Sequence, residues 1–165
     1  MADWTEIRDA VQAEWGTVSG VGEVSNYRRY LTKTETARSE LTSVIAGKTQ
    51  IAFADIDLQS ASLAVNGWGD ADTWDVSADV VLMGRVIRSQ RDSDASGAAF
   101  GVLLWNLFLS ASKAIARVSS DPSLAARVPV EIVANDLREF GMPGVGGTVC
   151  HYGEILIRVQ NTEAI

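Results

Sequence analysis

The alternation of hydrophobic and polar positions predicts a helix and then a strand at the start of the chain. Hydrophobic residues at positions 4, 7, 11 and 15 recur every three or four residues, which predicts an amphipathic helix over residues 2–15. Alternation over residues 23–31 predicts a short strand. Serines and threonines dilute the pattern of residues 34–46, where a helix is nevertheless expected.

The middle of the chain predicts a long hairpin followed by a long helix. Residues 50–65 and 75–87 read as two strands, and residues 66–73 between them hold the glycine, asparagine and aspartate typical of a turn. Hydrophobic residues then cover most of the circumference of a helix predicted over residues 95–118. We therefore expect this helix to lie in the core, with partners on two sides.

Two further strands are predicted near the end of the chain, over residues 130–137 and 148–160, on either side of a loop rich in glycine and proline. Strands thus cluster and do not alternate strictly with helices. This order predicts a single α+β domain over residues 1–165. Its sheet is expected to be mainly antiparallel, with four to five strands and a long hairpin. The N-terminal helix and the long central helix should pack against it.

Charge and composition exclude several classes of function. The chain has 165 residues and a net charge of −7, with a pI near 4.6, which opposes general attraction to nucleic acid. A single cysteine excludes an intrachain disulfide framework. The N-terminal residues lack the apolar core of a signal peptide, so an intracellular protein is expected.

The residues with catalytic potential do not form a recognisable site. Cys150 and His151 are neighbours on a predicted strand, so their side chains should point to opposite faces and cannot act as nucleophile and base. Asp55 and Asp57 share a strand face, but they are better interpreted as solvated acids than as cation ligands. No glycine-rich segment has phosphate-binding or dinucleotide-binding order. We therefore expect no enzyme activity, no metal and no cofactor.

The segment GVGEVSNYRRYL, residues 20–31, concentrates two arginines between two tyrosines. One interpretation is a partly exposed strand whose arginine stems cover apolar surface. The other is a subunit interface, where tyrosine and arginine are enriched. In an acidic protein, such arginines suit the acidic surface of an identical neighbour, which favours assembly.

The chain resembles the tail terminator and tail-to-head joining proteins found at the neck of tailed bacteriophages. The resemblance rests on the N-terminal helix followed by GVGEVSNYRRY, the hairpin that turns at NGW, the long apolar helix, and the closing segment GGTVCHYGEILIRVQ. By order of elements it covers most of the chain. It implies a non-enzymatic virion protein, assembled in the host cytoplasm, that forms a usually hexameric ring. Such a ring caps the tail tube, stops its polymerisation and joins it to the head connector.

The resemblance also implies partners, and together with the patterns above it leads to a hypothesis about individual residues. The expected partners are further copies of the chain, the tail tube protein and the head–tail connector or stopper protein, with DNA only passing through the lumen and no membrane. The subunit interface is assigned to Tyr27, Arg28, Arg29 and Tyr30. Contacts to the tube or connector are assigned to Trp68, Asp70, Asp72, Met142, Pro143 and Val145.

Two alternatives stay open beside a terminator. One is a head-completion or stopper protein of the same neck, because several neck proteins share α+β folds and a fold alone does not fix function. The other is a small acidic enzyme or ligand-binding domain with a pocket between the hairpin and the long helix.

Overall fold

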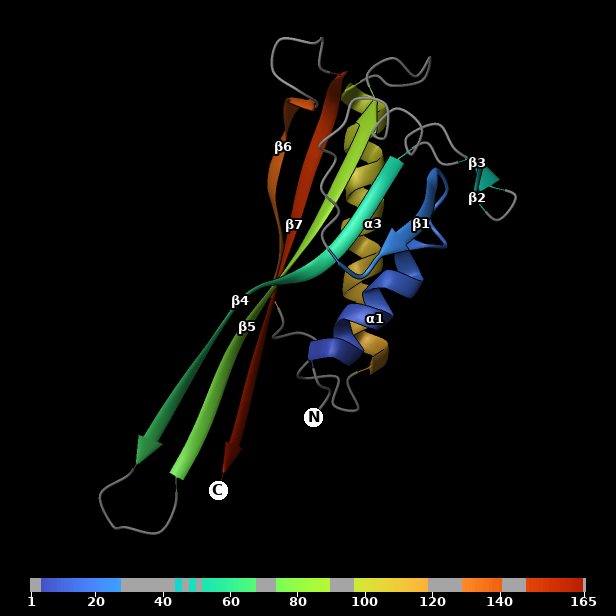
Figure 1. The fold of residues 1–165 in the computed structure, drawn as a ribbon. Coiled ribbons are helices and arrows are strands. Elements are labelled where there is room, and N and C mark those ends of the chain that lie inside the picture. The colour runs from blue at the N-terminus through green and yellow to red at the C-terminus, as the bar shows by residue number, and fades with distance from the viewer. Residues whose placement is uncertain are drawn as a thin grey trace.

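The computed structural model of the chain describes residues 4–27, 44–45, 48–49, 52–67, 74–89, 97–118, 129–140 and 148–164. One layer of sheet is covered by two helices, as Figure 1 shows. The helices are α1 (Trp4–Trp15) and α3 (Gly97–Val118). The strands are β1 (Val21–Ser25), β2 (Val44–Ile45), β3 (Lys48–Thr49), β4 (Ala52–Gly67), β5 (Trp74–Ser89), β6 (Val130–Phe140) and β7 (Thr148–Ala164).

The main sheet has five strands in the order β1-β4-β5-β7-β6. Strand β1 runs parallel to β4, and every other neighbouring pair is antiparallel. The predicted α+β class is confirmed, with a sheet that is mixed because of β1.

The prediction of a helix over residues 34–46 is wrong at residues 44 and 45, which are the described residues of this range. Val44 and Ile45 form β2, which pairs with β3 in a separate two-stranded ladder. Both residues are β-branched, and such side chains favour the extended backbone over the helix. The remainder of that prediction, up to residue 43, lies outside the described residues.

The core lies between the two helices and one face of the sheet, which we call the helix face. Helix α1 buries the side predicted from its periodicity, including Ile7, Val11 and Trp15. The Trp15 indole is fully buried, and its Nε1–H donates to the carbonyl oxygen of Leu107 in α3 at 2.9 Å. The ring lies against Gly84 of β5, where a Cβ would stand only 2.7 Å from Cζ3 and nearer still to Cη2.

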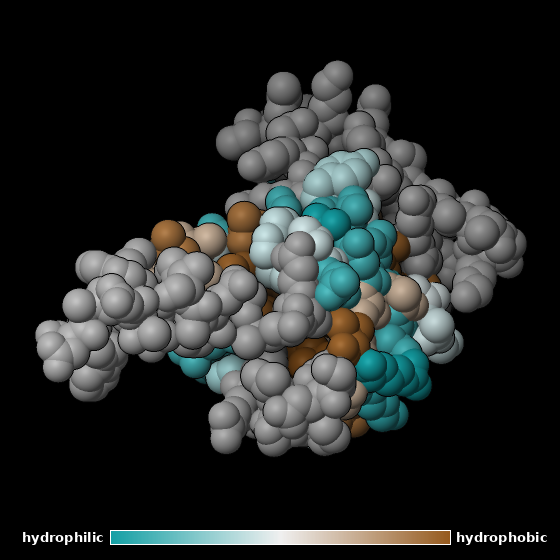
Figure 2. All heavy atoms as spheres, turned by 90° about the horizontal axis from the view of Figure 1, so that it is seen from below, coloured by the Kyte–Doolittle hydropathy of each residue, from teal (hydrophilic) through white to brown (hydrophobic). Residues whose placement is uncertain are grey.

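Helix α3 is the core helix that its sequence predicts. By length and composition alone it is apolar enough to cross a membrane, but its buried residues pack with α1 and the sheet. Its outer side still carries exposed hydrophobic residues, of which Val102 is 61% and Trp105 53% exposed. Figure 2 shows the molecule from below, with hydrophobic residues at the surface among hydrophilic ones.

Strands β4, β5 and β7 continue beyond the helices as a three-stranded projection (Figure 1). We call it the arm and define it as residues 58–67, 74–81 and 158–164. Pairing is continuous along it, from Leu58 opposite Leu82 to Gly67 opposite Trp74, and β7 follows β5 as far as Ala164. The long hairpin is confirmed, although residues 66 and 67, expected in the turn, extend β4.

A β-bulge between Leu58 and Ser60 marks the start of the arm on β4. Before the bulge, even-numbered residues such as Ile56 lie on the helix face. The extra residue shifts the alternation, so that Ala61 pairs with the core residue Val80 and the odd-numbered positions take over the helix face. The bulge therefore keeps one side of the sheet apolar while the strand continues into the arm.

Candidate functional site

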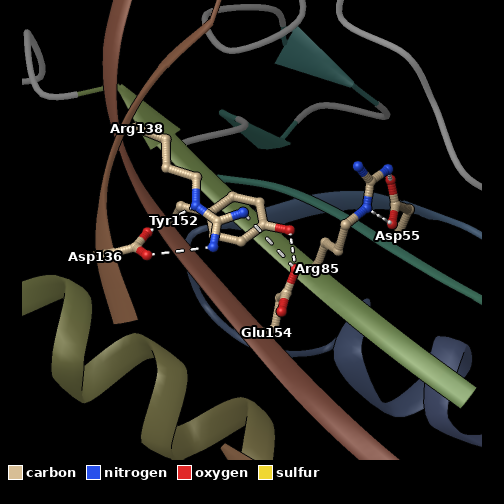
Figure 3. A network of polar contacts seen from close by, with 6 residues as sticks. All are labelled: Asp55, Arg85, Asp136, Arg138, Tyr152 and Glu154. Carbon is tan, nitrogen blue, oxygen red and sulfur yellow. Dashed lines mark hydrogen bonds and ion pairs between the residues drawn. The ribbon is translucent and has the colours of Figure 1, made fainter. Parts of the chain in front are cut away.

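The face of the sheet opposite the helices, which we call the open face, carries a network of charged and polar side chains that crosses four strands (Figure 3). Its members share this face and are connected in two groups. They are Asp55 on β4, Arg85 on β5, Tyr152 and Glu154 on β7, and Asp136 and Arg138 on β6.

The first group is a buried ion pair between Asp55 and Arg85, which lie directly opposite each other on β4 and β5. The Nε of Arg85 donates to one carboxylate oxygen at 2.9 Å, and Nη2 donates to the other. Asp55 is 1% and Arg85 8% exposed. Charges buried to this extent need a partner, and the two-point geometry of guanidinium and carboxylate supplies it. The interpretation of Asp55 as a solvated acid is therefore wrong.

The second group surrounds the ring of Tyr152. The Arg138 guanidinium lies over this ring at 3.7 Å and donates to Asp136 from Nε at 3.0 Å and from Nη2 at 3.2 Å. The Tyr152 hydroxyl donates to a carboxylate oxygen of Glu154. Burial, together with this hydrogen bond, raises the pKa of Tyr152 to about 12. The hydroxyl thus stays protonated at neutral pH and acts as a donor.

A hollow of about 310 Å³ opens on the same face between the two groups. Its polar lining contains three carboxylates and one guanidinium, so it favours a cationic or hydrogen-bond-donating group. The lining residues are Asp55, Asp57, Leu58, Gln59, Met83, Arg85 and Glu154. Within the part of the chain that the structure describes, no three His, Cys, Asp or Glu side chains gather as a metal site requires.

Cys150 and His151 point to opposite faces of the sheet, as the sequence predicts. Cys150 packs with Phe53, Ile87 and Tyr152 on the open face. His151 stacks on Phe100 of α3, with ring centroids 5.3 Å apart. Burial raises the pKa of the Cys150 thiol to about 11, which keeps it protonated at neutral pH. A protonated, fully buried thiol is a poor nucleophile, because the thiolate is the reactive form.

The assigned interface and contact residues lie mostly outside the described part of the chain. Tyr27 is described, at a bend after the end of β1, with 55% of its surface exposed. The predicted strand over residues 23–31 is wrong at residues 26 and 27, because β1 ends at Ser25, and its residues 28–31 lie outside the described part of the chain. The rest lie outside the described residues: Arg28, Arg29, Tyr30, Trp68, Asp70, Asp72, Met142, Pro143 and Val145.

Sequence reasoning missed the ion pair, although a signal for it is present. Arg85 is the only charged residue in the hydrophobic run of residues 80–87, and Asp55 follows the apolar start of β4. Aligning the two strands of the predicted hairpin around its turn brings opposite charges close together. The one-residue bulge sets the final register, and single-strand alternation does not reveal it.

A scan against models of known protein families finds no match for this chain, and a search of curated proteins finds no relative.

Proposed function

We propose that this chain is a virion structural protein that forms a ring at the head-proximal end of a phage tail tube. In this role it stops tube polymerisation and joins the tail to the head connector. The resemblance in the sequence supports the proposal, and one structural observation carries it. Beyond Val80 and Val159, which belong to the buried core, the helix face of the arm carries hydrophobic side chains such as Leu63 that the described part of the molecule leaves exposed.

The apolar face of the arm is an extension of the helix face. Ala61 and Leu63 lie on this side, since they pair with Val80 and Ala78 of β5 and alternate with serines. The two helices do not reach it, and Leu63 is 68% exposed. Burying a leucine side chain contributes about 2 kcal/mol, so this face is far better suited to an interface than to water.

The shape of the arm also supports assembly. At about 3.3 Å per residue, residues 58–67 extend about 30 Å, enough to reach across a neighbouring molecule. Sheets gain independent stability from a packed hydrophobic face, and among the described residues nothing packs on Leu63 on the helix face of the arm, so a partner could supply that contact. A projection on one side of a molecule that meets a different surface of the next copy is the heterologous contact from which closed rings are built.

The charge suits a channel through which DNA passes. A net charge of −7 repels the phosphate backbone, and an acidic lumen offers no counterion-release gain that would hold DNA in place. The members of the described polar network pair with one another, which suits the structural role that we propose for this face.

Electron microscopy of particles produced by a parent phage that lacks this gene tests the proposal. Overlong tails without heads are expected, because only loss of the stop signal lets the tube keep growing. Tails of normal length beside filled heads would instead show a stopper or joining role. Normal infectious particles would contradict every neck function.

The hollow on the open face favours a second candidate, a ligand-binding domain. It does not match the pocket expected between the hairpin and the long helix, because residues of β4, β5 and β7 line it from the open face. Its volume is at the lower limit of small-molecule sites. Native mass spectrometry of the purified protein decides this point: a stoichiometric small molecule, released on denaturation, would favour ligand binding over assembly.

A further inference from the structure

We propose that copies of this chain join by pairing the outer edge of β4 in one arm with the outer edge of β7 in the next arm, in parallel orientation. The inference rests on the proposed ring and specifies how its subunits connect.

Both outer edges of the arm lack a neighbouring strand among the described residues. Strand β1 pairs with β4 only as far as Ser25 opposite Asp55. On the other side, β6 pairs with β7 as far as Ile157, and the carbonyl of Pro129 then accepts the N–H of Arg158 at 3.0 Å. Among the residues that the structure describes, backbone N–H and C=O groups along both edges therefore have room for another strand.

After the bulge at its start, the edge of β4 in the arm has none of the features that normally prevent edge pairing. Residues 58–67, LQSASLAVNG, contain no charged residue and no proline, and the bulge lies only at their start. Strand β6, at the far edge of the same sheet, shows the opposite pattern, with charged residues at positions 131, 136, 138 and 139. Proteins protect exposed edges with charges, prolines and bulges. This molecule thus places charges on β6 and leaves the β4 edge of the arm without them, whereas the β7 edge of the arm carries Arg158 and Glu163.

The topology fixes the direction of the pairing and favours a second copy as the partner. Strands β4 and β7 are both antiparallel to β5, so they run in the same direction along the arm. Copies related by rotation about a ring axis bring β4 of one copy to β7 of the next in this common direction. One repeated contact then satisfies both edges of every arm and extends the sheet around the ring.

Backbone hydrogen bonds show which amides take part. Ala52 donates its N–H outward to the carbonyl of Gly20 at 2.8 Å, and alternate residues of a strand point the same way. Because the bulge shifts the alternation by one residue, the N–H groups that point outward, away from β5, belong after it to the odd-numbered residues, including Ala61 and Leu63. On β7 the N–H of Arg158 points outward, away from β5, and the N–H of Gln160, two residues further along, therefore also points outward.

Proline substitution removes an outward N–H without removing a bond of the arm's own ladder. Ala61→Pro blocks the β4 edge, and Gln160→Pro blocks the β7 edge. Ala61→Ser and Gln160→Thr are matched controls that keep the amide. Circular dichroism verifies that each variant is folded, and sedimentation velocity then measures assembly.

We expect the wild-type protein and both controls to form closed oligomers and each proline variant alone to remain monomeric. An equimolar mixture of the two proline variants should form dimers only, because one intact β4 edge and one intact β7 edge remain. In the wild-type oligomer, amide hydrogen exchange at Ala61, Leu63 and Gln160 should be at least about tenfold slower than in the monomer.

Three results would overturn the inference. They are oligomers of a proline variant alone, fast exchange at these amides within an oligomer, and a wild-type chain that stays monomeric at the highest concentration reached. A monomer that pairs only with a strand of another protein belongs to the last case. The proposed neck function is judged separately, from the tails of the phage that lacks the gene.

Discussion

A methyl group added at Gly84 tests whether the contact between α1 and the sheet depends on close packing of Trp15. In Gly84→Ala the new Cβ would overlap the indole ring. The ring is fully buried and holds a hydrogen bond to the Leu107 carbonyl, so it cannot move aside freely. Overpacking of a core costs about 1–3 kcal/mol, and loss of the indole hydrogen bond adds about 1 kcal/mol. We expect the free energy of unfolding to fall by about 2–4 kcal/mol.

Urea denaturation followed by far-ultraviolet circular dichroism measures this change. Gly101→Ala is the matched control, because a Cβ at Gly101 of α3 meets nothing within 4 Å and alanine is the better helix former, so the control should gain about 0.5–1 kcal/mol. Trp15→Leu completes a double-mutant cycle with Gly84→Ala. Additive effects of the two substitutions, or an unchanged stability of Gly84→Ala, would refute the packing argument.

Three further predictions concern other contacts and are measured by equilibrium unfolding. Asp55→Asn should lower the free energy of unfolding by about 3–5 kcal/mol, because the Arg85 charge stays buried without the carboxylate of Asp55. The double variant Asp55→Leu with Arg85→Met should recover most of this stability, because it removes both charges. A double variant that loses as much stability as Asp55→Asn would contradict this reasoning. Raising the pH from about 9 to about 11 should lower the free energy of unfolding of the wild type by roughly 2 kcal/mol through Cys150, because this thiol ionises at its ordinary pKa in the unfolded chain and not in the folded one. Cys150→Ala should lack this part of the loss and keep the part that comes from Tyr152, whose pKa is also raised. Gly153→Ala should cost only about 1 kcal/mol, less than Gly84→Ala, since the flexible Leu104 side chain faces the new methyl.

The elements that sequence predicted best are those with a long, regular local pattern. Periodicity located α1 and α3, and alternation located both strands of the long hairpin. The parallel pairing of β1 with β4 was not predicted, because it joins segments separated by residues whose pattern gave no clear element. The strand over residues 148–160 was predicted, but its extension to Ala164 and its place as the third strand of the arm were not, for a similar reason. The last residues of β7 pair with β5 at a distance of more than 80 positions along the chain.

The candidate site shows the same division between local and long-range information. Adjacent residues on a strand face opposite ways, which correctly separated Cys150 from His151. The ion pair of Asp55 and Arg85 depends on the register of the hairpin, which a bulge shifts by one residue. The local composition around Tyr27 suggested an interface but did not show that the strand ends before it.

The central strand β5 gives the arm a mechanical connection to the rest of the molecule. All of its residues from Asp75 to Ser89 pair with β7, and the same strand pairs with β4 from its first residue, Trp74, to Ile87. Its interstrand hydrogen bonds are perpendicular to the strand, so a pull along the arm loads many of them in shear at the same time and not one after another. Tension applied at the far end of the arm is thus transmitted into the helix-covered body without a flexible joint between the two.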